Sequence, residues 1–203
     1  GAAFAGFSFL VANNQMEQFV EIVGRGAVID IGGNSDVYTE ETLRGGVGVI
    51  SNNKVNLTAP DGVDTNASAI VIRSDGAAHG EQAVLSIENN TIVMMNDAAI
   101  WANGISIAIQ DNGAAVPQPF DEIVLNDNTL TGCGGVRIIS SSATENYAVG
   151  TVHCNDQKIL RTASFGIDLL CARDLIVCKS NTVRDAGSYP IRCEGKDASN
   201  ERA

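Results

Sequence analysis

Acidic side chains are concentrated in three segments that separate the apolar, alternating stretches of this 203-residue chain. Their polar residues are Asp36, Tyr38, Glu40 and Glu41, then Asp75, His79 and Glu81, then Asp111, Asp121 and Glu122. Paired carboxylates can act as acid and base in glycoside hydrolysis, which makes Asp36, Glu40 and Glu41 the candidate catalytic residues. The same oxygens could instead gather Ca²⁺. Solvated acidic loops are the interpretation that we favour, because the formal net charge of the chain is -11.

The composition argues against several classes of protein. The 13 Lys and Arg residues form no cluster, so we expect no binding to nucleic acid. No apolar run reaches the length of a membrane span, so we expect no membrane insertion. Hydrophobic residues make up 44% of the chain and aromatic residues only 5%, so a core must be built from Val, Ile, Leu and Ala.

The five cysteines all lie in the C-terminal half of the chain. They are Cys133, Cys154, Cys171, Cys178 and Cys193. They show no CxxC spacing and the chain has only two His, so we expect no metal site and no cofactor. An odd number of cysteines also argues against a complete set of disulfides. We interpret them as buried free thiols that pack as small hydrophobic side chains.

One phrase recurs six times along the chain with the pattern apolar, x, Asn/Asp/Ser, Asn/Gln, x, apolar. An example is LSIENNTIVM at Leu85–Met94. The fourth position is occupied by Asn14, Asn53, Asn90, Asn128, Gln157 and Asn181. The successive spacings are 39, 37, 38, 29 and 24 residues, and repeats at such a period indicate a solenoid or an array.

A second phrase follows each Asn phrase and alternates with period two, as a strand with one buried face does. Its copies are Gly26–Ile31, Ser68–Arg73, Gly104–Ile109, Gly135–Ser140, Gly166–Cys171 and Tyr189–Glu194. One unit therefore runs strand, Asn turn, short strand, Gly, strand and loop. The unit leaves no room for a helix, and in the last coil the loop shrinks to Ala172–Asp174.

This unit resembles the coil of the right-handed parallel β-helix, the pectate-lyase-like fold that is also found in phage tailspikes and many surface proteins. The resemblance covers nearly the whole chain. It implies an all-β, single-stranded right-handed parallel β-helix of about six coils, with an Asn ladder at one corner. We treat residues 1–203 as a single domain, and because the chain starts with Gly on an apparent strand we expect it to be a fragment of a longer protein.

Stacking of coils at about 4.8 Å places equivalent residues in columns. One predicted column is Val11, Ile50, Ile87, Leu125, Cys154 and Cys178, and another is Ile70, Ile105, Val136, Ile167 and Ile191. The fourth-position amides should adopt left-handed backbone geometry at the bend and hydrogen-bond along the stack. A row that binds a ligand is the alternative interpretation of these amides.

The alternation also predicts which side chains point outward. Before the Asn turn they are Leu10, Val47, Val49, Val84, Val124, His153, Leu175 and Val177. So apolar a row predicts that a neighbouring chain or another segment covers this face. His153 has no acidic residue beside it in the sequence, so we expect a surface role. On the strand formed by the second phrase, Arg137, Asp168 and Arg192 should align. They would form an ordinary surface salt bridge or a strip that binds a sugar or carboxylate.

The functional expectation is a non-catalytic structural or recognition segment of an extracellular or virion fibre, with surface polysaccharide as the candidate ligand. The alternatives are a polysaccharide lyase or glycoside hydrolase, and a scaffold domain within a larger enzyme or injection machine. Activity in pectate-lyase-like enzymes needs acidic or Ca²⁺-binding residues beside a basic residue on one strand face, and consecutive coils here carry no such set. The resemblance to tailspikes implies a homotrimer, and an adjacent domain of the parent chain is the other expected partner.

Overall fold

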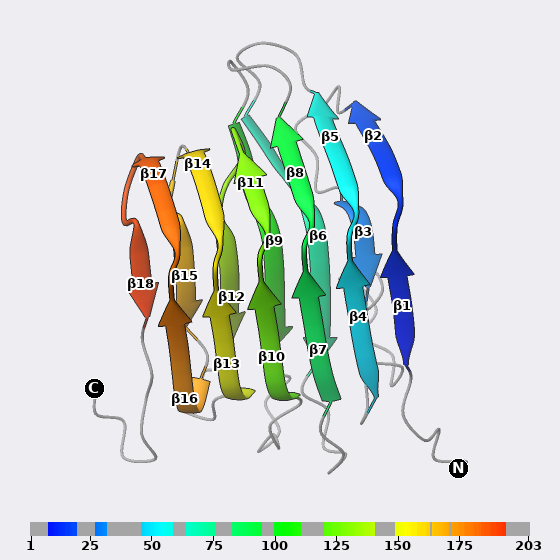
Figure 1. The fold of residues 1–203 in the computed structure, drawn as a ribbon, viewed down its shortest axis with the longest axis vertical. Coiled ribbons are helices and arrows are strands. Elements are labelled where there is room, and N and C mark those ends of the chain that lie inside the picture. Colours follow the sequence, from blue (N-terminus) through cyan, green and yellow to red (C-terminus); the bar gives the residue numbers. More distant parts are fainter. Residues whose placement is uncertain are drawn as a thin grey trace.

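The computed structural model describes residues 8–19, 27–31, 46–58, 64–75, 83–94, 100–110, 120–140, 149–162, 164–170 and 172–193. Within these ranges the chain forms eighteen strands in three parallel sheets of six strands each (Figure 1). These residues include no helix, and therefore no helix long and apolar enough to cross a membrane.

Each sheet collects one strand from every coil. The first sheet consists of β1 (Phe9–Ala12), β4 (Val47–Ser51), β7 (Ala83–Glu88), β10 (Phe120–Asn126), β13 (Val149–Asn155) and β16 (Ala172–Lys179). The second consists of β2 (Gln15–Phe19), β5 (Lys54–Thr58), β8 (Thr91–Met94), β11 (Thr129–Thr131), β14 (Lys158–Thr162) and β17 (Thr182–Ala186). The third consists of β3 (Ala27–Ile31), β6 (Asp64–Asp75), β9 (Ile100–Gln110), β12 (Val136–Ser140), β15 (Ile167–Leu170) and β18 (Ile191–Cys193).

The path of the chain is that of a right-handed coil. In Figure 1 each coil rises through the first and second sheets at the front and descends through the third sheet behind, while successive coils advance from right to left. The first coil is β1–β3 and the sixth is β16–β18. The predicted all-β parallel β-helix of six coils is therefore confirmed.

The core consists of the two predicted columns and their neighbours. The pairing runs Val11, Ile50, Ile87, Leu125, Cys154 and Cys178 through the first sheet. It runs Ile29, Ile70, Ile105, Val136, Ile167 and Ile191 through the third. The residues of the middle coils in both columns are fully buried, whereas those of the end coils are less so. No coil can bury its own apolar face, so the stack supplies the core.

The amide ladder at the corner between the first and second sheets is present. The Nδ2 of Asn14 donates to Asn53 Oδ1 at 2.9 Å, the Nδ2 of Asn53 donates to Asn90 Oδ1 at 2.9 Å, and the Nδ2 of Asn90 donates to Asn128 Oδ1 at 3.0 Å. Asn128 Nδ2 donates to Gln157 Oε1 at 3.1 Å. In each case the oxygen of one coil accepts from the preceding coil, so the ladder has a direction.

The left-handed backbone geometry lies one residue before the position predicted for it. Residues Asn13, Asn52, Asn89, Asp127, Asp156 and Ser180 have φ between 54° and 60°. Their side chains are exposed, whereas Asn53, Asn90, Asn128 and Gln157 are buried. The third position of the phrase thus bends the chain, since Asn and Asp tolerate this geometry, while the fourth position points inward and forms the ladder.

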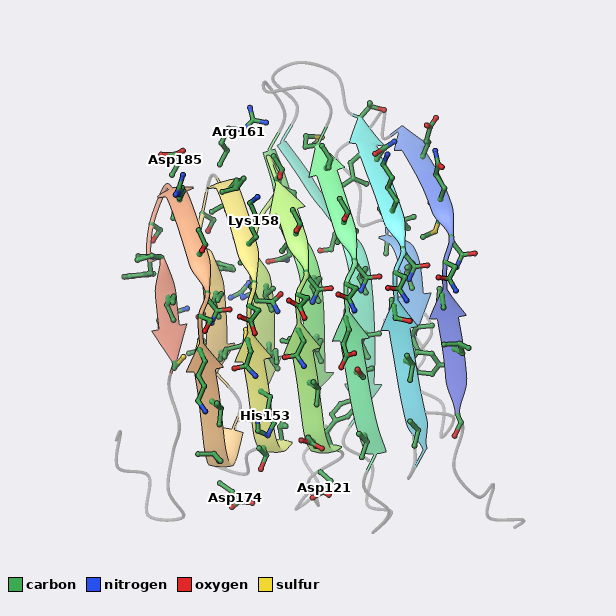
Figure 2. All side chains as sticks on the ribbon, in the orientation of Figure 1. Asp121, His153, Lys158, Arg161, Asp174 and Asp185 are labelled. Carbon is green, nitrogen blue, oxygen red and sulfur yellow. The ribbon has the colours of Figure 1, made fainter. Side chains whose placement is uncertain are left out.

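A second bend, which the repeat did not predict, lies at the C-terminal ends of β11, β14 and β17. Gly132, Arg161 and Asp185 occupy equivalent positions there and have φ of 72°, 55° and 56°. Figure 2 shows Arg161 and Asp185 at the same edge of the molecule. The repeat hides this corner because Gly, Arg and Asp share no side-chain chemistry.

Gly135 and Gly166 begin the second recurring phrase, which forms the third sheet, and they let neighbouring coils approach closely. A Cβ on Gly135 would collide with the carbonyl oxygen of Gly166, and one on Gly166 would lie 2.6 Å from the carbonyl oxygen of Pro190. The backbone N–H of Val136 donates to the Gly166 oxygen at 2.9 Å. A side chain at these positions would separate strands that must hydrogen-bond.

We expect Asn90→Ala to destabilise the fold by about 3 kcal/mol, because it leaves several buried partners unpaired. Asn90 Oδ1 accepts from the backbone N and the Nδ2 of Asn53, and its own Nδ2 donates to Ile50 O and Asn128 Oδ1. The measurement is the free energy of unfolding in urea. The control is Asn14→Ala at the exposed end of the ladder, which should cost less than about 1 kcal/mol. Equal losses would contradict the ladder as a source of stability.

Candidate functional site

The acidic residues singled out in the sequence do not form a site among the described residues. Asp36, Glu40 and Glu41 lie outside those residues, as do His79, Glu81 and Asp111. Asp121 and Glu122 were expected in a loop, and this is wrong because they lie in β10. That strand starts at Phe120, whose fully buried ring lies in line with Ala83 and Val149 of the adjacent strands. Ala172–Asp174 likewise belongs to β16 and not to a loop.

The third sheet brings Arg137, Asp168 and Arg192 together on its outer face, in three successive coils. Arg137 pairs in register with Asp168, and Asp168 with Arg192. The remainder of this outward column is Asp30, Val71 and Ser106. The expected alignment of the three charged residues is therefore observed, and they are separated by 31 and 24 residues along the chain.

Asp168 makes two kinds of contact with its arginine neighbours. Arg192 grips it in a bidentate manner, since Nε donates to Oδ1 at 2.6 Å and Nη2 donates to Oδ2 at 2.8 Å. Arg137 Nε lies 3.4 Å from Oδ2, an ion pair without a hydrogen bond. Bidentate arginine–carboxylate pairs are stronger and more directional than single contacts. Arg192 is therefore the main partner of the carboxylate.

The environment of Asp168 differs from the ordinary surface salt bridge that the sequence suggested. The carboxylate is completely buried, while the side chains of Arg137 and Arg192 are 35% and 32% exposed. Removing one partner of a buried charge leaves that charge uncompensated, which is far more costly than losing an exposed pair. The two arginines thus act as a cover over the carboxylate and present their own outer edges to solvent.

Two aromatic rings that were not predicted to lie beside these charges extend the arrangement. The guanidinium carbon of Arg137 lies 5.2 Å from the ring centre of Phe165, and that of Arg192 lies 5.3 Å from the ring centre of Tyr189. Phe165 and Tyr189 occupy equivalent positions, two residues before Ile167 and Ile191. This shared position in the repeat could have predicted that both rings lie beside the arginines. We call Arg137, Phe165, Asp168, Tyr189 and Arg192 the Arg–aromatic strip.

The Arg–aromatic strip combines an excess of one positive charge with exposed ring surface. Two guanidinium groups and one carboxylate give a net charge of +1, in a chain whose formal net charge is -11. Tyr189 is 54% exposed, and its ring is fixed by the cation–π contact with Arg192. Guanidinium groups bind carboxylates through paired hydrogen bonds, and aromatic rings offer flat apolar surface. These features suit an anionic ligand with a flat apolar face.

His153 has an acidic neighbour, contrary to the sequence-based expectation. Its Nε2 lies 3.3 Å from Oε1 of Glu122, and both side chains are partly exposed. Figure 2 shows His153 on β13, on the outward side of the first sheet. The pair was missed because Glu122 belongs to the previous coil and is diagonal to His153, its register partner being Thr151.

The outer face of the first sheet carries the predicted apolar row, with polar interruptions. Leu10, Val47 and Leu175 are 70%, 52% and 51% exposed. Val49, Val84, Val124 and Val177 are half-buried. Ser86, Glu122, Thr151 and His153 stand between them in the same two columns. The row is therefore most apolar toward the two ends of the stack.

The cysteines divide into a buried and an accessible set. Cys133 and Cys154 are buried, as predicted, and burial raises the pKa of Cys133 to about 12. Cys178 is half-buried and Cys193 is exposed, so the prediction is wrong for Cys193, which lies on the last strand of the stack. Hydrogen bonds from the Cys154 and Cys193 thiols and from Asn181 lower the pKa of Cys178. Cys171 lies outside the described residues.

The fold defines this chain as a parallel β-helix. Comparison with known proteins found no matching family model, no matching curated protein and no matching solved structure.

We expect Arg192→Ala to lower the free energy of unfolding by about 2–3 kcal/mol, because Asp168 would stay buried without its bidentate partner. Arg137→Ala is the matched control, since it removes a guanidinium of similar exposure that makes only the longer contact, and should cost less than about 1 kcal/mol. Urea denaturation of both variants measures the difference. A larger loss for Arg137→Ala would reverse the assignment of Arg192 as the main partner.

Thiol labelling should separate the cysteines by their burial. In the native chain at mildly alkaline pH, we expect iodoacetamide to modify Cys193 and Cys178 and to leave Cys133 and Cys154 unmodified. The thiolate is the reactive form, and both its formation and its access to reagent are suppressed by burial. Peptide mapping by mass spectrometry measures each site, and labelling in urea shows that every thiol can react. Equal native rates at Cys133 and Cys193 would contradict the packing described above.

Proposed function

We propose that this β-helix is a non-catalytic structural and recognition segment of an extracellular or virion fibre, such as a phage tail, a receptor-binding protein or an adhesin. The observation that carries the recognition part of the proposal is the Arg–aromatic strip, where Arg192 binds the buried Asp168 at 2.6 and 2.8 Å. Its ligand in this proposal is a surface polysaccharide that contains acidic sugars.

The chemistry of the Arg–aromatic strip supports an acidic sugar in particular. Asp168 neutralises one guanidinium, so the strip keeps one positive charge for a carboxylate of the ligand. Tyr189 adds an exposed ring on which the apolar face of a pyranose can stack. The strip runs across three coils, along the axis of the stack. A linear polysaccharide could therefore contact it through several successive sugar units.

The structural part of the proposal is supported by the apolar row on the first sheet. Leu10, Val47 and Leu175 are exposed beyond half of their surface, which is unusual for side chains that never contact a partner. Side-by-side packing of β-helices through this face would bury them. The expected arrangement is a homotrimer, or a contact with an adjacent domain of the parent chain.

The alternative function is a polysaccharide lyase or glycoside hydrolase that acts along a face of the β-helix. One observation favours it, namely the contact of 3.3 Å between His153 and Glu122, which resembles a base held by a carboxylate. Both groups lie on the first sheet, whereas the Arg–aromatic strip lies on the third. An enzyme would need the His153–Glu122 pair of one sheet and the Arg–aromatic strip of another to act on one substrate. Binding needs the Arg–aromatic strip alone, so it requires fewer residues to act together.

The test is binding of the chain to an array of neutral and uronate-containing oligosaccharides, with reducing-sugar release measured on the same compounds. We expect binding to the acidic compounds, no release of sugar, and at least about tenfold weaker binding for Arg137→Ala and Tyr189→Ala. Arg137 is chosen because it is not the main partner of Asp168. Lys158→Ala is the matched control, since Lys158 is an exposed cation on the second sheet (Figure 2).

Several outcomes would overturn the proposal. Equal weakening by Lys158→Ala would mean that binding depends on general charge and not on the Arg–aromatic strip. Release of sugar that is lost in His153→Ala, Asp36→Ala or Glu40→Ala would favour the enzyme. Absence of binding to every acidic compound would remove the recognition part.

A further inference from the structure

The two end coils of the described stack have complementary hydrogen-bonding groups. The amide ladder is directional, because each side-chain oxygen accepts from the backbone N and the Nδ2 of the preceding coil. Among the described residues no donor reaches the Oδ1 of Asn14, which begins the ladder. At the other end Asn181 donates from Nδ2 to Cys154 O and Cys178 Sγ, and its backbone N–H has no acceptor within the described residues. One end thus offers an acceptor, the Oδ1 of Asn14, and the other offers a donor, the backbone N–H of Asn181.

Suppose that the amide ladder continues from the sixth coil of one copy onto the first coil of another. Apolar side chains of the two end coils are then in line. Placing Asn181 over Asn14 puts Cys178 over Val11 and Val183 over Met16, and in the third sheet it puts Ile191 over Ile29. Val11, Met16, Cys178 and Val183 are half-buried and Ile191 is 44% exposed, whereas the equivalent residues of the middle coils are fully buried. Each end therefore has an unfinished core layer of the kind that another coil completes.

Charges at the ends are also complementary in this register. Arg184, three residues after Asn181, would face Glu17, three residues after Asn14. Arg192, which already binds Asp168, would lie next to Asp30 in the same outward column. Arg184 and Glu17 are both exposed and make no ion pair within the described part of the chain. An opposite-charge contact between Arg184 and Glu17 would not follow from apolar end coils alone.

We propose that a second copy of this chain stacks on the first head to tail, with the sixth coil of one copy against the first coil of the next in the register of the amide ladder. Strands of both end coils run in the same direction as those of the stack. Because β16–β18 and β1–β3 each have a neighbouring strand on one side only among the described residues, they can pair with each other in parallel. The contact joins two different surfaces, so it repeats and produces a rod of many copies. It is independent of side-by-side packing through the first sheet, which leaves both ends of the stack unchanged.

The experiment is sedimentation velocity of the full chain over a wide range of concentration, with electron microscopy of the same samples. We expect rods that lengthen with concentration at constant width. Glu17→Arg and Arg184→Glu should each weaken self-association by about tenfold, because like charges then face each other at the junction. Lys158→Glu is the matched control and should leave the rods unchanged, because Lys158 is exposed on β14 in the fifth coil and not on an end strand of the second sheet.

Mixing the two charge variants gives the sharpest test. In an equimolar mixture of Glu17→Arg and Arg184→Glu, every junction between unlike variants has opposite charges at positions 17 and 184. Rods should therefore return at the wild-type concentration dependence. A side-by-side contact through the first sheet would not show this rescue, because positions 17 and 184 both lie in the second sheet.

Three outcomes would overturn the proposal. The wild-type chain could remain monomeric at every concentration, as it would if other segments cover the ends. It could form compact oligomers of fixed size that the charge variants do not affect, which would support side-by-side packing instead. It could form rods that neither variant weakens, which would place the contact elsewhere. Binding to oligosaccharides is measured separately, so failure here leaves the proposed function unchanged.

Discussion

The fold depends on how the chain satisfies its buried polar groups at the corner where each coil turns from the first sheet into the second. Asn53, Asn90, Asn128 and Gln157 are almost completely buried there. Their amides donate to carbonyl groups of the previous coil, as Asn90 does to Ile50 O at 3.0 Å, and their oxygens accept from that coil as well. An unpaired buried amide or carbonyl costs about 1–3 kcal/mol, so the slot requires a side chain that both donates and accepts.

Gln157 shows how narrow this requirement is. It occupies the ladder position in the fifth coil with one methylene more than Asn, and its Nε2 donates to Leu125 O and Asn155 O. The continuity to the sixth coil is made by its backbone N–H, which donates to Asn181 Oδ1 at 2.8 Å. The longer side chain thus keeps the bond to the previous coil, and the backbone supplies the bond to the next. The ladder tolerates a change of length but keeps the carboxamide.

The ladder determines the register of everything that follows it. Once Asn128, Gln157 and Asn181 are stacked, the outward residues of the third sheet are aligned as well, which is how Asp168 comes to lie between two arginines. The close approach at Gly135 and Gly166 holds the coils at hydrogen-bonding distance on that side. A carboxylate that is completely buried on an outer face is therefore a consequence of coil stacking, because its cover comes from the coils before and after it.

Residues that repeat could be interpreted from the sequence, and residues that meet only once could not. The six Asn phrases and the period-two strands predicted the parallel β-helix, both core columns, the amide ladder and the alignment of Arg137 with Asp168. Local geometry within the phrase was misplaced by one residue, because Asn suits both the left-handed bend at position 89 and the ladder at position 90. Side-chain pairing across coils decided the rest: the burial of Asp168, the rings beside its arginines, the contact of His153 with Glu122, and the exposure of Cys193. Sequence periodicity specifies which residues share a column, but distance and burial depend on the neighbours that the stack brings from 24 to 39 residues away.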